Sequence, residues 1–137
     1  KYIDESQTLL TAGVDGCYMY QVNFKKTFDP KQSLVLDPDG QQFDAKLGKM
    51  KRLESTPLWI KGLKVLKKQE KIFTWSQVKA TFHDLQGKLI FEYENMTKFE
   101  DYLTDVIIND RYNYFITSTM SGLILVWKYY AKKTLVH

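Results

Sequence analysis

The chain has 137 residues, 44% of them hydrophobic and 26% charged. This excludes the composition of disordered chains, in which low hydrophobicity meets high net charge, and it leaves enough length for a buried core. Aromatic residues reach 15%, and because aromatic and β-branched side chains favour pleated sheets, we expect an ordered β protein. The net charge of +4 would attract acidic partners without requiring nucleic acid.

The single cysteine, Cys17, cannot form an intrachain disulfide, and zinc sites built on cysteine pairs are excluded. We therefore expect a reducing compartment, the cytoplasm. No apolar run approaches the roughly 20 residues that span a bilayer, and the N-terminus lacks the apolar stretch of a signal peptide, so we expect no membrane partner. Because the chain starts at Lys1 rather than at Met, we expect it to be a segment of a longer protein.

The first predicted element is a β-hairpin. A β-rich run, Leu9 to Val14, leads into Asp15-Gly16, and a second run, Cys17 to Phe24, follows. Tight turns between antiparallel strands need residues that tolerate positive φ. Asp-Gly between two such runs is therefore a strong hairpin signal.

From Lys25 to Pro57 this pattern is lost. Asp29-Pro30 and Asp37 to Gly40 predict turns around a short strand at 33–36, and the lysine-rich stretch from Lys46 to Glu54 is expected to be mobile. We interpret the whole segment as an inserted loop or an elaborated outer strand. It is our candidate docking element, because binding residues gather on such segments.

Four candidate strands follow in the middle of the chain. They are Trp59 to Lys67, Ile72 to Gln77, Val78 to His83 and Lys88 to Glu94. The last of these alternates polar and apolar residues, as a half-exposed outer strand would.

The C-terminal part predicts the best-defined sheet. Its strands are expected at Asp105 to Ile108, Phe115 to Thr119 and Leu123 to Tyr129. Polar residues at 109–113 supply the turn between the first two of these strands.

The first and last segments repeat one pattern. An ungapped alignment equates Leu10 with Ile116, Gly16 with Gly122, and Gln21 with Trp127. Phe73 and Ile116 lie 43 residues apart, inside the roughly 40 to 45 residues that one four-stranded propeller blade needs. Leu10 and Phe73 lie 63 residues apart, and an insertion explains the excess.

The strings LLTAGVDGCYMYQV (9–22) and FITSTMSGLILVWKY (115–129) resemble the second and third strands of WD repeats. The residues at the family's repeat positions are Thr11, Asp15, Gly16, Thr117, Gly122 and Trp127. In the family, a strand hydroxyl and the tryptophan join a histidine of a Gly-His dipeptide in a hydrogen-bonded network. This chain has no Gly-His dipeptide, and Lys128 replaces the terminal aspartate. The fold assignment therefore depends on the period and on the turn chemistry.

The resemblance implies an all-β fold made of antiparallel four-stranded blades, forming a partial WD-repeat β-propeller of two to three blades. Residues 1–24 would end one blade, 25–57 would be the insertion, 58–97 the second blade and 98–137 the third. Propellers need roughly four to eight blades. The remainder of the propeller would come from the same polypeptide or from another chain.

The strings LLTAGVDGC, WIKGLKV and IFTWSQ, together with the long insertion, resemble the large divergent WD-repeat proteins of motile-cilium axonemes. This implies a non-catalytic scaffold for protein–protein interactions. It would dock microtubule-associated complexes in the cytoskeleton of the ciliary axoneme.

Enzyme chemistry is poorly supported. The only histidines are His83 and His137, no nucleophile motif lies near them, and we interpret His83 and Asp84 as a strand-end surface pair. Asp37, Asp39 and Asp44 do not have the spacing of an EF-hand loop, and no glycine-rich phosphate loop is present. We expect no catalysis, no metal and no cofactor.

The densest basic stretch is our candidate partner-binding site. Its residues are Lys61, Lys64, Lys67, Lys68 and Lys71. Strand alternation would divide these lysines between two faces, which favours a solvent-exposed strand, while an acidic protein surface such as a tubulin tail is the partner we consider. The alternative hypothesis is a self-contained basic β domain that binds nucleic acid or phosphoinositide.

Overall fold

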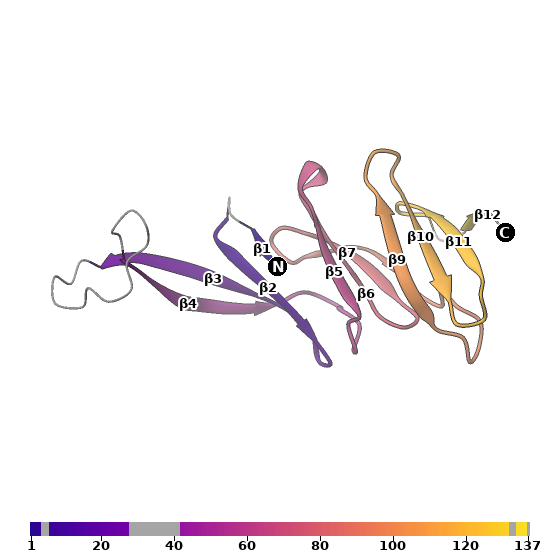
Figure 1. The fold of residues 1–137 in the computed structure, drawn as a ribbon, viewed down its shortest axis with the longest axis horizontal. Helices are drawn as coiled ribbons and strands as arrows, with labels where there is room; N and C mark the ends of the chain where they lie inside the picture. Colours follow the sequence, from indigo (N-terminus) through magenta and orange to yellow (C-terminus); the bar gives the residue numbers. More distant parts are fainter. Residues whose placement is uncertain (4–5, 28–41, 132–133, 137) are drawn as a thin grey trace.

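The fold is all-β, as the composition predicts. The structure is a computed structural model, and it describes residues 1–3, 6–27, 42–131 and 134–136. In these residues every strand pairing is antiparallel, and the strands form three sheets that follow one another along the chain. Figure 1 shows the sheets side by side along the long axis of the molecule, from indigo through magenta to yellow.

Each sheet has four strands in chain order. The first contains β1 (Tyr2–Ile3), β2 (Thr8–Gly13), β3 (Gly16–Thr27) and β4 (Gln42–Arg52). The second contains β5 (Gly62–Leu66), β6 (Lys71–Trp75), β7 (Ala80–Asp84) and β8 (Leu89–Tyr93), with a short 3-10 helix, η1 (Lys67–Gln69), between β5 and β6. The third contains β9 (Leu103–Asn109), β10 (Tyr114–Thr119), β11 (Ile124–Lys128) and β12 (Thr134–Val136). The described sheets form an open stack and do not close into a ring.

The predicted hairpin joins β2 to β3. Val14 and Asp15 form its turn, and Gly13 pairs with Gly16. Gly16 has a φ of +128°, a region that favours glycine because a Cβ is poorly tolerated there. A Cβ at Gly16 would also approach the Thr56 hydroxyl to 2.8 Å. The turn therefore needs this glycine for both its backbone and its packing.

The segment that follows is a two-stranded arm. β3 and β4 pair over most of their length, from Tyr18 opposite Arg52 to Thr27 opposite Gln42, and Figure 1 shows this pair projecting away from the stack. The prediction that Lys46 to Glu54 is mobile was wrong, because residues 46–52 belong to β4 and Leu53 is buried in the core. The turns and the short strand predicted within 28–41 lie outside the described residues.

Two buried clusters hold the sheets face to face. The cluster between the first and second sheets contains Ile3, Leu10, Cys17, Met19, Leu53 and Ile72. The cluster between the second and third is largely aromatic and includes Phe73, Phe82, Tyr93, Phe115, Trp127 and Tyr129. Its rings interlock: Phe115 stacks on Trp127 and meets Tyr93 edge-on at a centroid distance of 5.1 Å. Burial of each such ring contributes about 1.5–3 kcal/mol, so the stacking of the sheets stabilises the fold.

Candidate functional site

A buried side-chain hydrogen bond connects the second and third strands of the third sheet. The Trp127 indole N–H donates a hydrogen bond of 3.0 Å to the Thr117 hydroxyl, and both residues are buried. In the second sheet, the Thr74 and Thr81 hydroxyls make a comparable bond of 2.7 Å. All three hydroxyls are buried, so these bonds tie β10 to β11 and β6 to β7 at points that water cannot reach.

Threonine recurs at one repeat position in all three sheets. Thr74 and Thr117 lie 43 residues apart in β6 and β10, and Thr11 has the same place in β2. Thr74 and Thr117 are fully buried because a preceding sheet covers them, whereas Thr11 in the first sheet is exposed. The burial of this position therefore depends on whether a neighbouring sheet is present.

Burial on the opposite face of these strands also depends on whether a neighbouring sheet is present. Phe73 in the second sheet packs fully buried against the third sheet. Its repeat equivalent, Ile116 in β10, points away from the stack and is only partly buried. Each end of the stack thus exposes a face that is covered in the middle.

The ungapped alignment of the first and last segments was wrong by one residue after the turn. Cross-strand pairing matches Leu9 with Tyr20 and Phe115 with Trp127, so Tyr20 rather than Gln21 occupies the tryptophan position. The reason is a longer turn between β10 and β11, in which Thr119 bonds to Leu123. Gly122 (φ +84°) lies within that turn, whereas Gly16 belongs to β3.

In the second sheet, His83 stands where the third sheet has Trp127. Its partner across the strands is Ile72, the equivalent of Phe115. The His83 ring is fully buried, its Nε2 lies 2.6 Å from the Glu54 carbonyl oxygen, and its Nδ1 has no partner. Because a carbonyl only accepts hydrogen bonds, Nε2 carries the proton.

The burial of His83 lowers the pKa of its imidazole, more than the Glu54 carbonyl and nearby carboxylates raise it. The prediction of a surface pair with Asp84 was wrong. The Asp84 carboxylate instead accepts bonds from the backbone N–H groups of Gln86 and Lys88.

Within the described residues, no group of three or more His, Cys, Asp or Glu side chains is arranged to hold a metal ion. Asp37 and Asp39 lie outside those residues.

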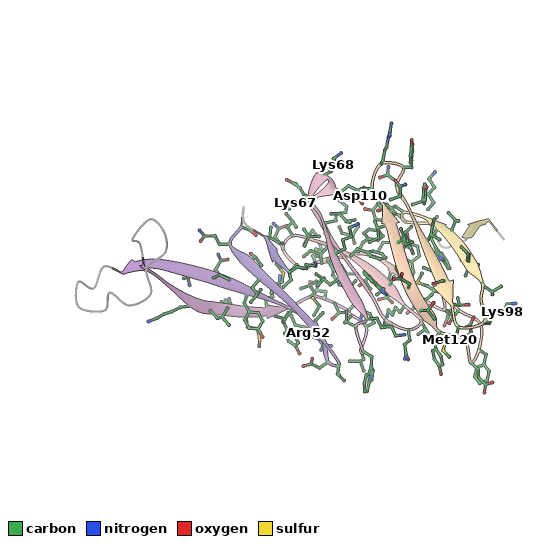
Figure 2. All side chains as sticks on the ribbon, in the orientation of Figure 1. Arg52, Lys67, Lys68, Lys98, Asp110 and Met120 are labelled. Atoms are coloured by element: carbon green, nitrogen blue, oxygen red, sulfur yellow. The ribbon has the colours of Figure 1, made fainter. Side chains whose placement is uncertain are left out.

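The five predicted lysines are not gathered into one patch. Lys61 precedes β5 and donates to the Leu103 carbonyl at 3.0 Å, while Lys67 and Lys68 lie in η1 beyond the other end of β5. Figure 2 shows Lys67 and Lys68 at the upper edge of the stack. Lys64 is exposed within β5, and the Lys71 ammonium group bonds to the Gln69 carbonyl.

Four further basic residues lie on the arm. Lys46, Lys49, Lys51 and Arg52 are all exposed on β4, the edge strand of the first sheet. Sequence reasoning missed this surface because it treated the stretch as mobile. The sequence did contain an indication of it, because basic residues this close together cannot all be buried in a strand and therefore predict an exposed basic surface.

The fold and these surfaces define an all-β protein of stacked, chain-ordered antiparallel sheets. Comparison with family models, curated proteins and solved structures gave no match. Among the described residues, no helix has the length and apolar character needed to cross a bilayer.

Proposed function

We propose that this chain is a set of stacked, WD-repeat-like blades from a β-propeller and that it acts as a non-catalytic scaffold for protein–protein interactions. The observation that carries the proposal is the burial of repeat positions. The middle sheet buries both Thr74 and Phe73, whereas the equivalents Thr11 and Ile116 lie on uncovered end faces. A sheet of this kind buries its apolar faces only by stacking on similar neighbours.

Both end faces carry the apolar side chains that stacking requires. On the third sheet, Ile107, Ile116 and Val126 are cross-strand neighbours on the outer face, and Ile107 is 63% exposed. On the first sheet, Leu9 and Tyr20 are cross-strand neighbours on the face that points away from the second sheet. Covering each of these large side chains would contribute about 1.5–3 kcal/mol.

Light scattering during size-exclusion chromatography tests whether the end faces associate. We expect the chain to increase in mass with concentration, because its uncovered faces bind one another, and Ile107→Lys/Ile116→Lys to remain monomeric. Ile90→Lys, at an exposed isoleucine of β8, is the matched control and should behave as the original chain. A chain that stays monomeric at every concentration and is indifferent to the double change would contradict the stacking proposal.

We further propose that the scaffold docks microtubule-associated complexes in the ciliary axoneme. The sequence resemblance supports this assignment, and so do the exposed lysines of β4 and of η1, which would attract acidic tubulin tails. Attraction between exposed charges weakens with salt.

Co-sedimentation with microtubules at increasing salt tests this partner. We expect the bound fraction to fall with salt and to fall further in Lys49→Glu/Lys51→Glu and in Lys67→Glu/Lys68→Glu. Binding that neither variant changes would rule out a charge-driven contact with tubulin. Displacement of the chain by RNA at equal charge concentration would instead favour the self-contained nucleic-acid-binding hypothesis.

A further inference from the structure

The outer edge of the first sheet is open along the arm. β4 is the last strand of that sheet, and every residue from 46 to 52 is exposed. The Leu53 backbone N–H donates a hydrogen bond of 2.9 Å to the Cys17 carbonyl. Because the residues of an antiparallel pair alternate between facing the partner strand and facing away from it, Lys51 also faces β3, whereas the N–H and C=O groups of Met50 point to the open edge. This edge therefore presents backbone donors and acceptors that a further strand could bind.

The two faces of β4 carry side chains of different chemistry. Leu47 and Met50 pair with Val22 and Tyr20 of β3 on one face, and they are 61% and 55% exposed. Because neighbours along a strand point to opposite faces, the lysines beside them occupy the other face. These lysines are Lys46, Lys49 and Lys51. A strand added at this edge would meet apolar side chains on one face and ammonium groups on the other.

The charge of this edge is uniformly basic. Its charged residues are Lys46, Lys49, Lys51 and Arg52. There is no acidic residue at 46–52, or at 18–23 in the facing part of β3. Like charges on adjacent strands destabilise their pairing, so this edge disfavours pairing with the same edge of a second copy. An acidic strand has the complementary charge.

The backbone of this edge favours a protein segment over a nucleic acid. Its C=O groups need hydrogen-bond donors, which an ionised phosphate cannot supply. An extended peptide offers both N–H and C=O groups at alternate residues, which is how peptides add to exposed sheet edges. The side chains of β4 then determine the pattern of the partner, with acidic residues beside the lysines and apolar residues beside Leu47 and Met50.

We propose that the open edge of β4 binds an extended protein segment of alternating acidic and apolar residues, which adds to the first sheet as a fifth strand. The acidic residues lie beside Lys49 and Lys51, and the apolar residues cover Met50 on the opposite face. This inference rests on the proposed function, which assigns acidic partners to the lysines of β4. It adds the backbone pairing that holds such a partner.

Fluorescence anisotropy of the full chain with a labelled seven-residue peptide that alternates glutamate and valine tests the proposal. We expect this peptide to bind. A peptide of the same composition, with its glutamates and valines in separate blocks, should bind at least tenfold more weakly. Methylation of the backbone nitrogens of the alternating peptide should weaken binding as much, because it removes the donors of strand pairing without changing the charge.

Variants of β4 provide the second arm of the test. Met50→Pro removes an N–H group at the open edge, where proline is tolerated because that N–H does not pair with β3. We expect it to weaken binding at least tenfold, whereas Met50→Ala, the matched control, should retain most of the affinity. Lys46→Glu/Lys49→Glu should abolish binding by reversing the charge. Melting temperatures will verify folding, and the peptide comparison needs no variant.

The proposal is overturned if the alternating peptide does not bind or if the block and methylated peptides bind as tightly as it does. Tighter binding of a 12-nucleotide oligouridine than of the alternating peptide would also overturn it, in favour of nucleic acid. Binding that depends on the lysines but not on the backbone groups would leave the acidic partner of the proposed function in place and remove the fifth strand. Peptide binding without microtubule binding would do the reverse.

Discussion

At the scale of single residues, one cross-strand position has three different occupants with three different partners. Trp127 donates to a buried threonine, His83 bonds to a backbone carbonyl from the connection after β4, and Tyr20 lies on an uncovered face. The position thus retains a large ring with a polar edge, but the hydrogen bond differs in each sheet. The three sheets therefore share no single hydrogen-bonded arrangement at this position.

Replacing Trp127 with phenylalanine tests the hydroxyl bond. The change leaves the buried Thr117 hydroxyl without its donor, and an unsatisfied buried group costs about 1–3 kcal/mol. Urea unfolding should show a loss of stability of this size. In a double-mutant cycle, adding Thr117→Val should cost less in the Trp127→Phe background than alone; equal costs would show that the two side chains are not coupled.

His83 predicts a dependence of stability on pH. Its pKa in the folded state lies below its usual value because the ring is buried, so the unfolded chain binds the proton more readily. Stability is therefore fully present above about pH 6.5, the ordinary histidine pKa, and decreases as the pH falls below it toward the folded-state pKa.

Thermal unfolding measured between pH 7.5 and 5 will check this. His83→Gln retains a donor for the Glu54 carbonyl but does not titrate, so it should show a smaller loss of melting temperature on acidification. An identical pH profile in both proteins would assign the dependence to other groups.

At the scale of elements, the hairpin at 13–16 was predictable from local sequence, whereas the arm was predictable only in part. The hairpin follows from Asp15-Gly16, whose backbone preference acts over two residues. The sequence predicts either an inserted loop or an elaborated outer strand at 25–57, and residues 42–52 do form β4, the outer strand of the first sheet. The bounds of β4 could not be predicted, because it is a strand through its pairing with β3, and residues 28–41 separate the two strands. Considered alone, its sequence resembles that of a loop, because it is rich in lysine and its alternation of polar and apolar residues is interrupted at Gly48.

The arm leads directly into the core at the end of β4, so the residues there contribute to the stability of the fold. Leu53, immediately after β4, is 1% exposed, whereas Leu47 within β4 is 61% exposed. Leu53→Ala should therefore cost about 2–5 kcal/mol of unfolding free energy, while Leu47→Ala should cost little. Deleting 25–57 as a unit should be destabilising for the same reason. Equal effects of the two alanine substitutions, measured by urea unfolding, would place Leu53 outside the core.

At the scale of the whole molecule, the three sheets are covered to different degrees although their repeats are equivalent. The sequence allowed the 43-residue spacing of the last two units and the all-β class to be predicted, because both depend on turn residues and strand composition. The different coverage of Phe73 and Ile116 could not be predicted, because it depends on which sheets lie on either side of each unit.

Phe73 and Ile116 measure this difference in coverage. Phe73→Ala removes a ring that is fully buried between the second and third sheets and should cost about 3–5 kcal/mol. Ile116→Ala, at the same repeat position on the uncovered face, should cost far less in a monomeric sample. Comparable losses in chemical denaturation would mean that the outer face of the third sheet is already covered in solution.

The agreement between sheet order and chain order has a consequence for biosynthesis. A polypeptide emerges from the ribosome N-terminus first, and domains and repeats tend to fold in that order. The first sheet needs no residue beyond its own strands to pair, so it can form while the rest of the chain is still being translated. Each later sheet can then pack on the exposed apolar face of the sheet before it. Because the strands of each sheet are consecutive in the chain, no strand has to insert between strands that have already paired.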